Sequence, residues 1–335
     1  MEVGASRCWH GQLHLNFERE GSHTRQRVIQ VQAPLKVQRA FYGRSPLDSP
    51  SPEGSGAVLG RDTAGAESTG RVGMGGAGMG RDTAGHFWGD CQTVALHTAG
   101  GLVGGDRLTF KATWEPHTAS LITTAAATKV YGSGESGRDP QDPLPPLARQ
   151  DVHLSLATGS HGEWLPQETI VFAGANYAQT LRVDLAAGAT WLGWDITRLG
   201  RSARREEFRS GRWRSQGEVW RQGVPLWIDP QGIQGCGDLW DSPQALAQQP
   251  VIATLAWVGQ PVSPDLVAAA RSRWHDRPEP TATAQGGVTR LMEGLLCRYR
   301  GPSTAEARSW FVEVWRLVRR DRQGPPPAIP RVWPL

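Results

Sequence analysis

Apolar residues alternate with polar ones in several separate stretches of this 335-residue chain, and this pattern constrains the fold more than any other feature. The alternating apolar positions are Leu13, Leu15 and Phe17; Leu108, Phe110, Ala112 and Trp114; Val152, Leu154 and Leu156; and Leu181, Val183 and Leu185. A period of two is typical of a β-strand with one buried face and one wet face. The 41 Gly and 24 Pro residues add frequent turns. The sequence therefore predicts a mainly β protein.

Two of these stretches continue in the same way along the chain. Residues 115–119 and 186–189 each form a short break that ends in Ala, and each break leads into another strand-like run, at 121–124 and 191–192. The echo indicates a repeated strand–turn–strand unit. We therefore expect stacked strands in a β-helix-like or sandwich-like scaffold.

About two α-helices are expected beside the strands, one of them near the C-terminus. Ser303 and Glu306 have the spacing of a capping box, in which each side chain accepts a backbone N–H of the first helical turn. An apolar stripe follows at three- and four-residue steps: Ala307, Trp310, Phe311, Val314, Trp315 and Val318. The simpler interpretation is that this stripe packs on the sheet, and the alternative is that it docks on another protein. A shorter helix is expected near Asp265–Trp274, opened by Pro264.

Two low-complexity segments look like insertions into one domain that spans residues 1–335. The first, at about 44–85, is rich in Gly, Ser and Pro and contains the hexapeptide Gly-Arg-Asp-Thr-Ala-Gly twice, at 60–65 and 80–85. The residues between the two copies are small or polar and have little to bury, so a surface loop is favoured over a solenoid repeat. The second insertion, at about 132–146, has the same character and ends in a Pro-rich run.

Several classes of protein are disfavoured by what the sequence lacks. Residues 1–20 have no apolar run of signal-peptide length, and no stretch of about 18 apolar residues could span a membrane, so we expect a cytoplasmic protein. The net charge of +4 comes from interleaved acidic and basic residues without a long basic tract, so no nucleic-acid partner is expected. The four cysteines are widely scattered, which favours free thiols over a zinc cage.

Nucleotide-binding and catalytic motifs are also missing or out of context. No G-x-x-x-x-G-K-[ST] phosphate loop is present, and no G-x-S-x-G nucleophile elbow. Gly132, Gly134 and Gly137 fit G-x-G-x-x-G, but Pro140 and Pro143 follow at once, so the helix that a dinucleotide site requires cannot form. His10 and His14 lie on an alternating stretch, where residues four apart are about 13 Å apart and cannot share a metal.

The segment Gly-Gly-Leu-Val-Gly-Gly-Asp at 100–106 remains as the most distinctive motif. Paired glycines around two apolar residues indicate a backbone that bends tightly at both ends or that another segment approaches closely. Asp106 can cap such a turn by accepting nearby N–H groups. From physics alone, a buried double turn between strands explains the motif.

The same motif is similar to a signature of the UreD family of urease accessory proteins. That family has His-x-x-Gly-Gly-x-x-Gly-Gly-Asp, matched here by residues 97–106, although Ala99 replaces a common Pro. Further family elements match in order: Thr123, Thr124, Lys129, Val130 and Tyr131; Pro166–Ile170; Gly200–Ala203 with Glu206 and Phe208; Arg298–Gly301; and Pro330–Trp333. Arg205 departs from the pattern, since the family usually has Gly there. The chain is identified as resembling the UreD family from about residue 34 to 333.

The resemblance implies a non-catalytic scaffold or chaperone for nickel insertion during urease maturation, and thus a role in nitrogen metabolism. It implies a cytoplasmic complex with UreF, with the GTPase UreG and with the urease apoprotein (UreA, UreB and UreC). No tightly bound cofactor is expected, only Ni²⁺ in transit, held by weak and exchangeable ligands.

The resemblance also suggests roles for particular residues. Three carboxylates are candidates for the lining of a nickel passage: Asp106, Glu168 and Glu206. The glycines of the signature (Gly100, Gly101, Gly104 and Gly105), together with Lys129 and Arg201, are expected to hold the fold. Each carboxylate could equally be structural.

One alternative of a different class stays open at this point. A β-solenoid hydrolase could use Asp106 and Glu168 as paired carboxylates, which requires the two groups to lie roughly 5–10 Å apart in a cleft.

Overall fold

The computed structural model describes residues 8–21, 23–42, 91–132, 144–277, 281–322 and 329–333. The insertion predicted at about 44–85 lies outside these ranges, as does most of the one predicted at 132–146. The division of the chain into one domain with two insertions therefore stays a prediction.

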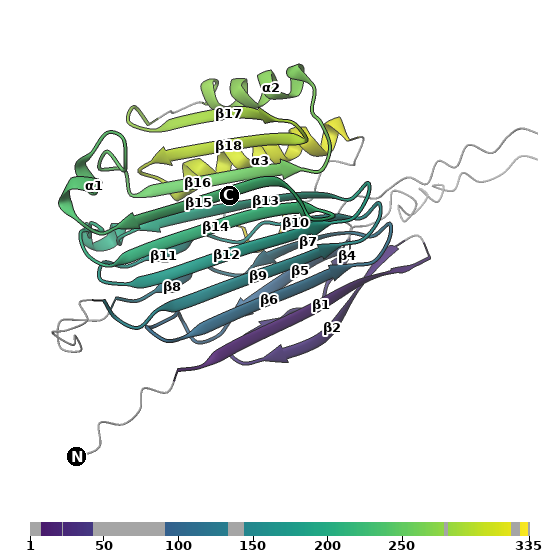
Figure 1. Ribbon diagram of the computed structural model, residues 1–335, viewed down its shortest axis with the longest axis horizontal. Coiled ribbons are helices and arrows are strands. Elements are labelled where there is room, and N and C mark those ends of the chain that lie inside the picture. Colours follow the sequence, from purple (N-terminus) through teal and green to yellow (C-terminus); the bar gives the residue numbers. More distant parts are fainter. Residues whose placement is uncertain are drawn as a thin grey trace, which may run out of the picture. The chain divides into compact units, whose positions relative to one another are not determined.

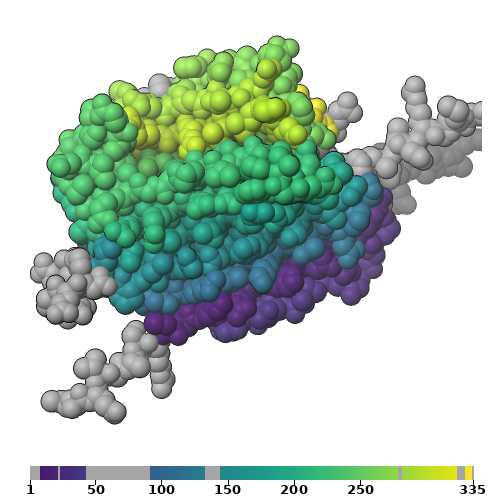
Figure 2. Space-filling view, in the orientation of Figure 1, coloured from purple at the N-terminus to yellow at the C-terminus, as the bar shows by residue number. Residues whose placement is uncertain are grey.

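Two β-sheets account for most of the described residues, as the alternating pattern predicts (Figure 1). Sheet A has the order β15 (Val224–Gln234), β14 (Arg212–Arg221), β12 (Asn176–Leu185), β9 (Ala148–Leu156), β6 (Arg107–Trp114), β1 (His10–Glu20) and β2 (His23–Gln32). Its five central strands run parallel, and only the edge strands β15 and β2 are antiparallel to their neighbours. In the space-filling view these strands form successive bands from purple to green (Figure 2).

Sheet B has the order β17 (Gln285–Leu291), β18 (Gly294–Gly301), β16 (Val251–Val258), β13 (Thr190–Leu199), β10 (His161–Trp164), β7 (Ala119–Thr124), β5 (Cys91–His97) and β3 (Leu35–Val37). It contains β7, β10 and β13, the strands that follow β6, β9 and β12 of sheet A along the chain. Three short strands lie off this path: β8 (Thr128–Val130), β11 (Thr169–Val171) and β4 (Phe41–Tyr42). Strands β7, β10 and β13 are parallel, so the chain crosses from sheet A to sheet B at the same end of each unit.

The repeated strand–turn–strand unit is present, and its length differs from one repeat to the next. The hydrogen bond from Thr180 to Asp151 joins equivalent positions of β12 and β9 that are 29 residues apart. The bond from Thr123 to the carbonyl of Leu165 joins equivalent positions that are 42 residues apart. The longer spacing spans the predicted insertion at 132–146, and the strands on either side of it keep their parallel register.

Three α-helices and one 3₁₀ helix accompany the sheets in the described ranges. They are α1 (Gly237–Asp241), α2 (Pro264–His275), α3 (Thr304–Asp321) and η3 (Ser202–Arg204). The predicted C-terminal helix and the helix opened by Pro264 are confirmed, whereas α1 was not expected. No helix in these ranges is both long enough and apolar enough to cross a membrane.

The central strands of sheet B, such as β13 and β16, are buried on both faces, and this divides the core into two layers. The first layer lies between the sheets and contains Phe110, Val152 and Trp191, which is why the alternating positions of sheet A are apolar. The second layer lies between sheet B and the helices α2 and α3, and it contains Leu192 and the predicted stripe of α3. The stripe therefore packs on the sheet, as the simpler interpretation requires.

Candidate functional site

The signature Gly100–Asp106 forms a tight double turn between β5 and β6. Gly100 and Gly105 supply the bends, with φ of +78° and +92°, a region that favours glycine. Gly101 and Gly104 serve close approach: a Cβ at Gly101 would lie 2.7 Å from the carbonyl oxygen of Lys129, and one at Gly104 would lie 2.7 Å from that of Pro146. Tight bending and close approach thus both occur, at different glycines.

Asp106 caps this turn from a buried position, with 1% of its surface exposed. Its Oδ2 accepts the backbone N–H of Val103 at 2.9 Å, and its Oδ1 accepts the backbone N–H of Trp9 at 3.3 Å. The carboxylate therefore ties the turn to the residue that precedes β1.

Replacing Asp106 by Asn should lower the free energy of unfolding by about 1–3 kcal/mol, the cost of a buried polar group left without a partner. An amide offers one oxygen where two N–H donors now need an acceptor. Urea unfolding of D106N measures this, with D184N on the wet face of β12 as the control, since Asp184 is exposed. Unchanged stability together with poorly metallated urease would instead favour a nickel-guiding role for Asp106.

The other residues singled out from the sequence lie apart from the turn. Glu168 forms an ion pair with Arg308 of α3, whose side chain is 8% exposed. Glu206 accepts two hydrogen bonds from the guanidinium of Arg201, at 2.7 and 2.8 Å, and so closes the loop around η3. Lys129 has an exposed side chain, and its carbonyl accepts the N–H of Leu102 at 2.8 Å. No contact brings Asp106, Glu168 and Glu206 together, and their place in a nickel passage stays a prediction.

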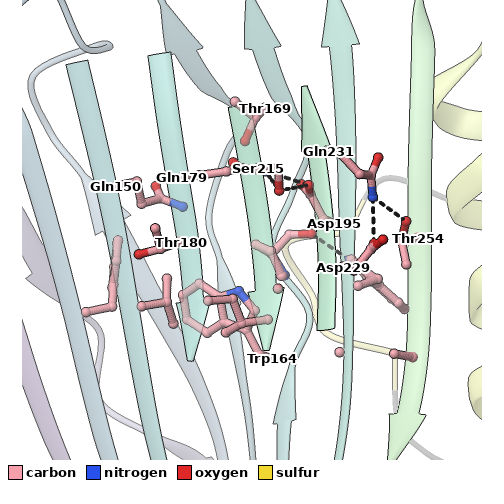
Figure 3. A pocket seen from close by; sticks show the side chains of 18 of the residues that line it. Gln150, Trp164, Thr169, Gln179, Thr180, Asp195, Ser215, Asp229, Gln231 and Thr254 are labelled. Carbon is pink, nitrogen blue, oxygen red and sulfur yellow. Dashed lines mark hydrogen bonds between the residues drawn. The ribbon is translucent and has the colours of Figure 1, made fainter. Parts of the chain in front are cut away.

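A cavity of about 60 Å³ lies between the two sheets (Figure 3). One part of its wall is aromatic: Phe110, Trp164, Trp191 and Trp227. The other part is polar, and strand register places its residues in rows. Sheet A contributes Gln150, Gln179, Ser215 and Gln231, which face one another across β9, β12, β14 and β15. Sheet B contributes Asp195 of β13 and Thr254 of β16.

Asp195 is a cavity carboxylate whose hydrogen-bond donors are neutral side chains. Its Oδ2 accepts the side-chain amide of Gln179 at 2.5 Å, and its Oδ1 accepts the hydroxyl of Thr197 at 3.3 Å. Burial raises the pKa of Asp195 to about 6, and the hydrogen bonds from Thr197, Gln179 and Ser215 oppose this rise. Near neutral pH the cavity therefore contains a carboxylate that lacks a matching positive charge.

Asp229 of β15 is a second carboxylate in the same cavity, and its charge is balanced. Its Oδ1 lies 2.5 Å from the guanidinium of Arg298. Its Oδ2 accepts the amide of Gln231 at 2.7 Å (Figure 3). Only 8% of the Asp229 surface is exposed. The two carboxylates interact electrostatically, since the charge of Asp229 contributes to the raised pKa of Asp195.

This arrangement can hold a cation weakly. The cavity offers carboxylate, hydroxyl and amide oxygens, and no cluster of three His, Cys, Asp or Glu side chains that could hold a metal occurs in the described parts of the chain. Such oxygen donors bind late first-row metals less tightly than imidazole or thiolate does. A divalent ion could therefore enter and leave.

The sequence reasoning overlooked both cavity carboxylates. Asp195 is two residues after Gly193 and four after the inward-facing Trp191, and Asp229 is two residues after Trp227. Each carboxylate occupies an alternate position that the strand pattern assigns to the buried face, and this could have identified it from the sequence.

The paired-carboxylate hydrolase gains no support from the residues it would use. Asp106 accepts two backbone N–H groups, and Glu168 is engaged by Arg308. Neither lines the cavity between the sheets.

Comparison with known proteins gives a consistent result. The family model described as UreD urease accessory protein matches residues 82–334. The urease accessory protein UreD of Acaryochloris marina is 43% identical over 328 residues, which cover 98% of this chain and 96% of that protein. The urease accessory protein UreD of Nostoc punctiforme is 44% identical over 325 residues, covering 97% and 96%.

Proposed function

The chain belongs to the UreD urease accessory protein family, and we propose that it is a scaffold through which nickel reaches the urease metallocentre. In this role it acts with UreF, with UreG and with the urease apoprotein (UreA, UreB and UreC) in the cytoplasm. It has no catalytic activity of its own, and nucleotide hydrolysis belongs to UreG, since this sequence has no phosphate-binding loop.

The observation that carries the proposal is the pair of carboxylates in the cavity between the sheets. Asp195 and Asp229 approach this cavity from opposite sheets, and neutral oxygen groups surround them. A metal in transit needs ligands that it can exchange, and a cage of cysteines and histidines would trap it. The cavity thus has donor groups that suit weak, exchangeable binding of Ni²⁺ during its transfer to urease.

The electrostatics of the cavity support a divalent cargo. Moving a bare cation into a protein interior is costly unless opposite charge is already present. Asp195 supplies one such charge. Burial destabilises its ionised form, and a cation beside it would relieve that cost, so binding of a cation there is favoured. The neighbouring Asp229 supplies the second.

The test is the nickel content of urease that matures with a variant of this protein. In D195N/D229N the cavity keeps its shape but loses both negative charges, so nickel per urease active site should fall by about tenfold or more. Metal analysis of urease co-expressed with UreF, UreG and the variant gives the value. D184N is the control, because Asp184 is an exposed carboxylate of β12 that does not line the cavity. Normal nickel content in a well-folded D195N/D229N protein would contradict the proposal.

A further inference from the structure

Arg298 of β18 lies at the edge of the cavity and neutralises one of its two carboxylates. Its guanidinium is 2.5 Å from Oδ1 of Asp229 and 3.3 Å from the hydroxyl of Thr254. Strand register places Arg298 in one row with Thr254 and Asp195, so all three project from the same face of sheet B. The side chain of Arg298 nevertheless keeps 43% of its surface exposed, whereas Asp229 keeps 9%. The arginine therefore pairs with a carboxylate of the cavity while its own side chain stays in contact with solvent.

The net charge of Asp195, Asp229 and Arg298 together does not match that of a divalent cation. With Arg298 in place, the guanidinium offsets the charge of Asp229, and the cavity offers a divalent ion only one carboxylate without an ion-pair partner, that of Asp195. If the guanidinium withdraws, Asp195 and Asp229 together carry two negative charges, which match a divalent cation. A carboxylate that is already paired with an arginine is a poor metal ligand, because the guanidinium occupies its lone pairs.

The structure has room for this withdrawal. The neighbour of Arg298 across the β17–β18 pair is Gly287, which lies on the same face of the sheet. A Cβ built at Gly287 meets no atom within 4 Å, so the space beside Arg298 on its solvent side is open. A long, half-exposed side chain next to a glycine can change rotamer at little cost.

We propose that Arg298 is a displaceable counter-ion, which occupies Asp229 when no metal is present and gives way over Gly287 when Ni²⁺ passes. The guanidinium thereby lowers the affinity of the cavity for nickel and helps to expel the ion by returning to Asp229. This inference rests on the proposed function, since it assigns a regulating residue to the same cavity.

The direct test is Ni²⁺ binding to the purified full-length protein, measured by competition with a chromophoric chelator. R298M keeps an unbranched aliphatic stem but removes the guanidinium and its charge, and it should bind Ni²⁺ about tenfold more tightly than the wild type. R300M is the matched control: Arg300 lies two residues along the same strand and donates to the carbonyls of Pro243 and Ala245, away from the cavity carboxylates. Equal nickel affinity of R298M and R300M would overturn the proposal.

A second variant keeps the test decisive if R298M does not fold. G287L leaves both Arg298 and Asp229 in place but fills the space into which the guanidinium would move. Nickel per urease active site should fall severalfold with G287L at an unchanged melting temperature, and normal loading would count against the counter-ion role. Failure of the proposed function looks different, because D195N/D229N would then load urease normally. If D195N/D229N impairs loading while R298M and G287L behave like the wild type, only the role of Arg298 is lost.

Discussion

Replacing Arg319 by Ala should lower the free energy of unfolding by about 3–5 kcal/mol, the range measured when one partner of a buried ion pair is removed. Arg319 projects from α3 toward β10 and pairs with Glu163, at 2.6 Å from Nη2 to Oε2 and at 2.8 Å from Nε to Oε1. The side chain of Glu163 is 0% exposed and that of Arg319 is 3% exposed. Without the guanidinium, Glu163 would be a buried charge that keeps its contacts to the indole of Trp315 and the ring of His161 but has lost its cation.

The dependence of this loss on pH distinguishes a charge effect from a packing effect. Burial alone would raise the pKa of Glu163, but the charge of Arg319 and the hydrogen bonds from His161 and Arg319 lower it to about 2. In the wild type, the stabilisation is present above the ordinary glutamate pKa and disappears as the pH falls toward 2. In R319A burial dominates and raises that pKa. The difference in unfolding free energy between the two proteins should therefore grow between about pH 3 and pH 7.

Two further variants serve as controls for the pair. E163L/R319M replaces both ions by apolar side chains and should recover most of the lost stability, because an apolar pair avoids the desolvation of two charges. R316A removes an exposed partner of Glu313 on the same helix and should cost less than about 1 kcal/mol. Urea unfolding curves provide all of these values. A loss in R319A no larger than that in R316A would mean that the buried pair does not hold α3 on the sheet.

The alternating pattern predicted β1, β6, β9 and β12 of sheet A and their inward faces, but not β2, β14 or β15. Leu15, Leu108 and Leu154 are each 1% exposed and Trp114 is fully buried, as their phase requires. The pattern succeeds here because one face of each strand is wet and the other is dry. It is weaker for sheet B, where β16 is buried on both faces and reads as a continuous apolar run.

The capping box was predicted correctly in one half and incorrectly in the other. The N–H of Glu306 donates to the hydroxyl of Ser303 at 3.2 Å, as expected. The Glu306 carboxylate, however, accepts the hydroxyl of Tyr299 at 2.8 Å and pairs with Arg277, and the N–H of Ser303 donates to the hydroxyl of Tyr299. Local spacing cannot reveal this, because the competing partners come from β18 and from the end of α2.

The cavity, too, is formed by residues that are distant in the sequence, so local patterns could not predict it. The sequence motifs directed attention to Asp106, Glu168 and Glu206, each of which has a described structural partner. Asp195 and Asp229 are 34 residues apart in the chain and lie outside the family motifs. They meet the same cavity only because the two sheets stack. A motif can identify the family, whereas the cavity results from tertiary packing.

Replacing Gly211 by Ala should destabilise the protein more than the same change at Gly223, although both glycines have left-handed backbones. Their φ angles are +99° and +83°. At Gly223, in the β14–β15 turn, a Cβ meets nothing within 4 Å, so only the backbone conformation is penalised, by about 1–2 kcal/mol. At Gly211 a Cβ would overlap the carbonyl oxygen of Ala175, which adds about 1–3 kcal/mol for overpacking against rigid backbone.

The clash at Gly211 also reaches the proposed nickel site. That oxygen of Ala175 accepts the N–H of Arg212 at 2.7 Å, the bond with which β14 begins its parallel pairing with β12. Strand β14 brings Ser215 into the cavity, so a displaced start of β14 would widen the polar row that faces Asp195. We therefore expect G211A to lower both the urea midpoint and the nickel content of co-expressed urease, and G223A to lower the midpoint modestly at normal nickel content. Equal stability of the two variants would contradict this expectation. It would show that β14 can shift against β12 to accept a side chain, so that this wall of the cavity is not held rigidly.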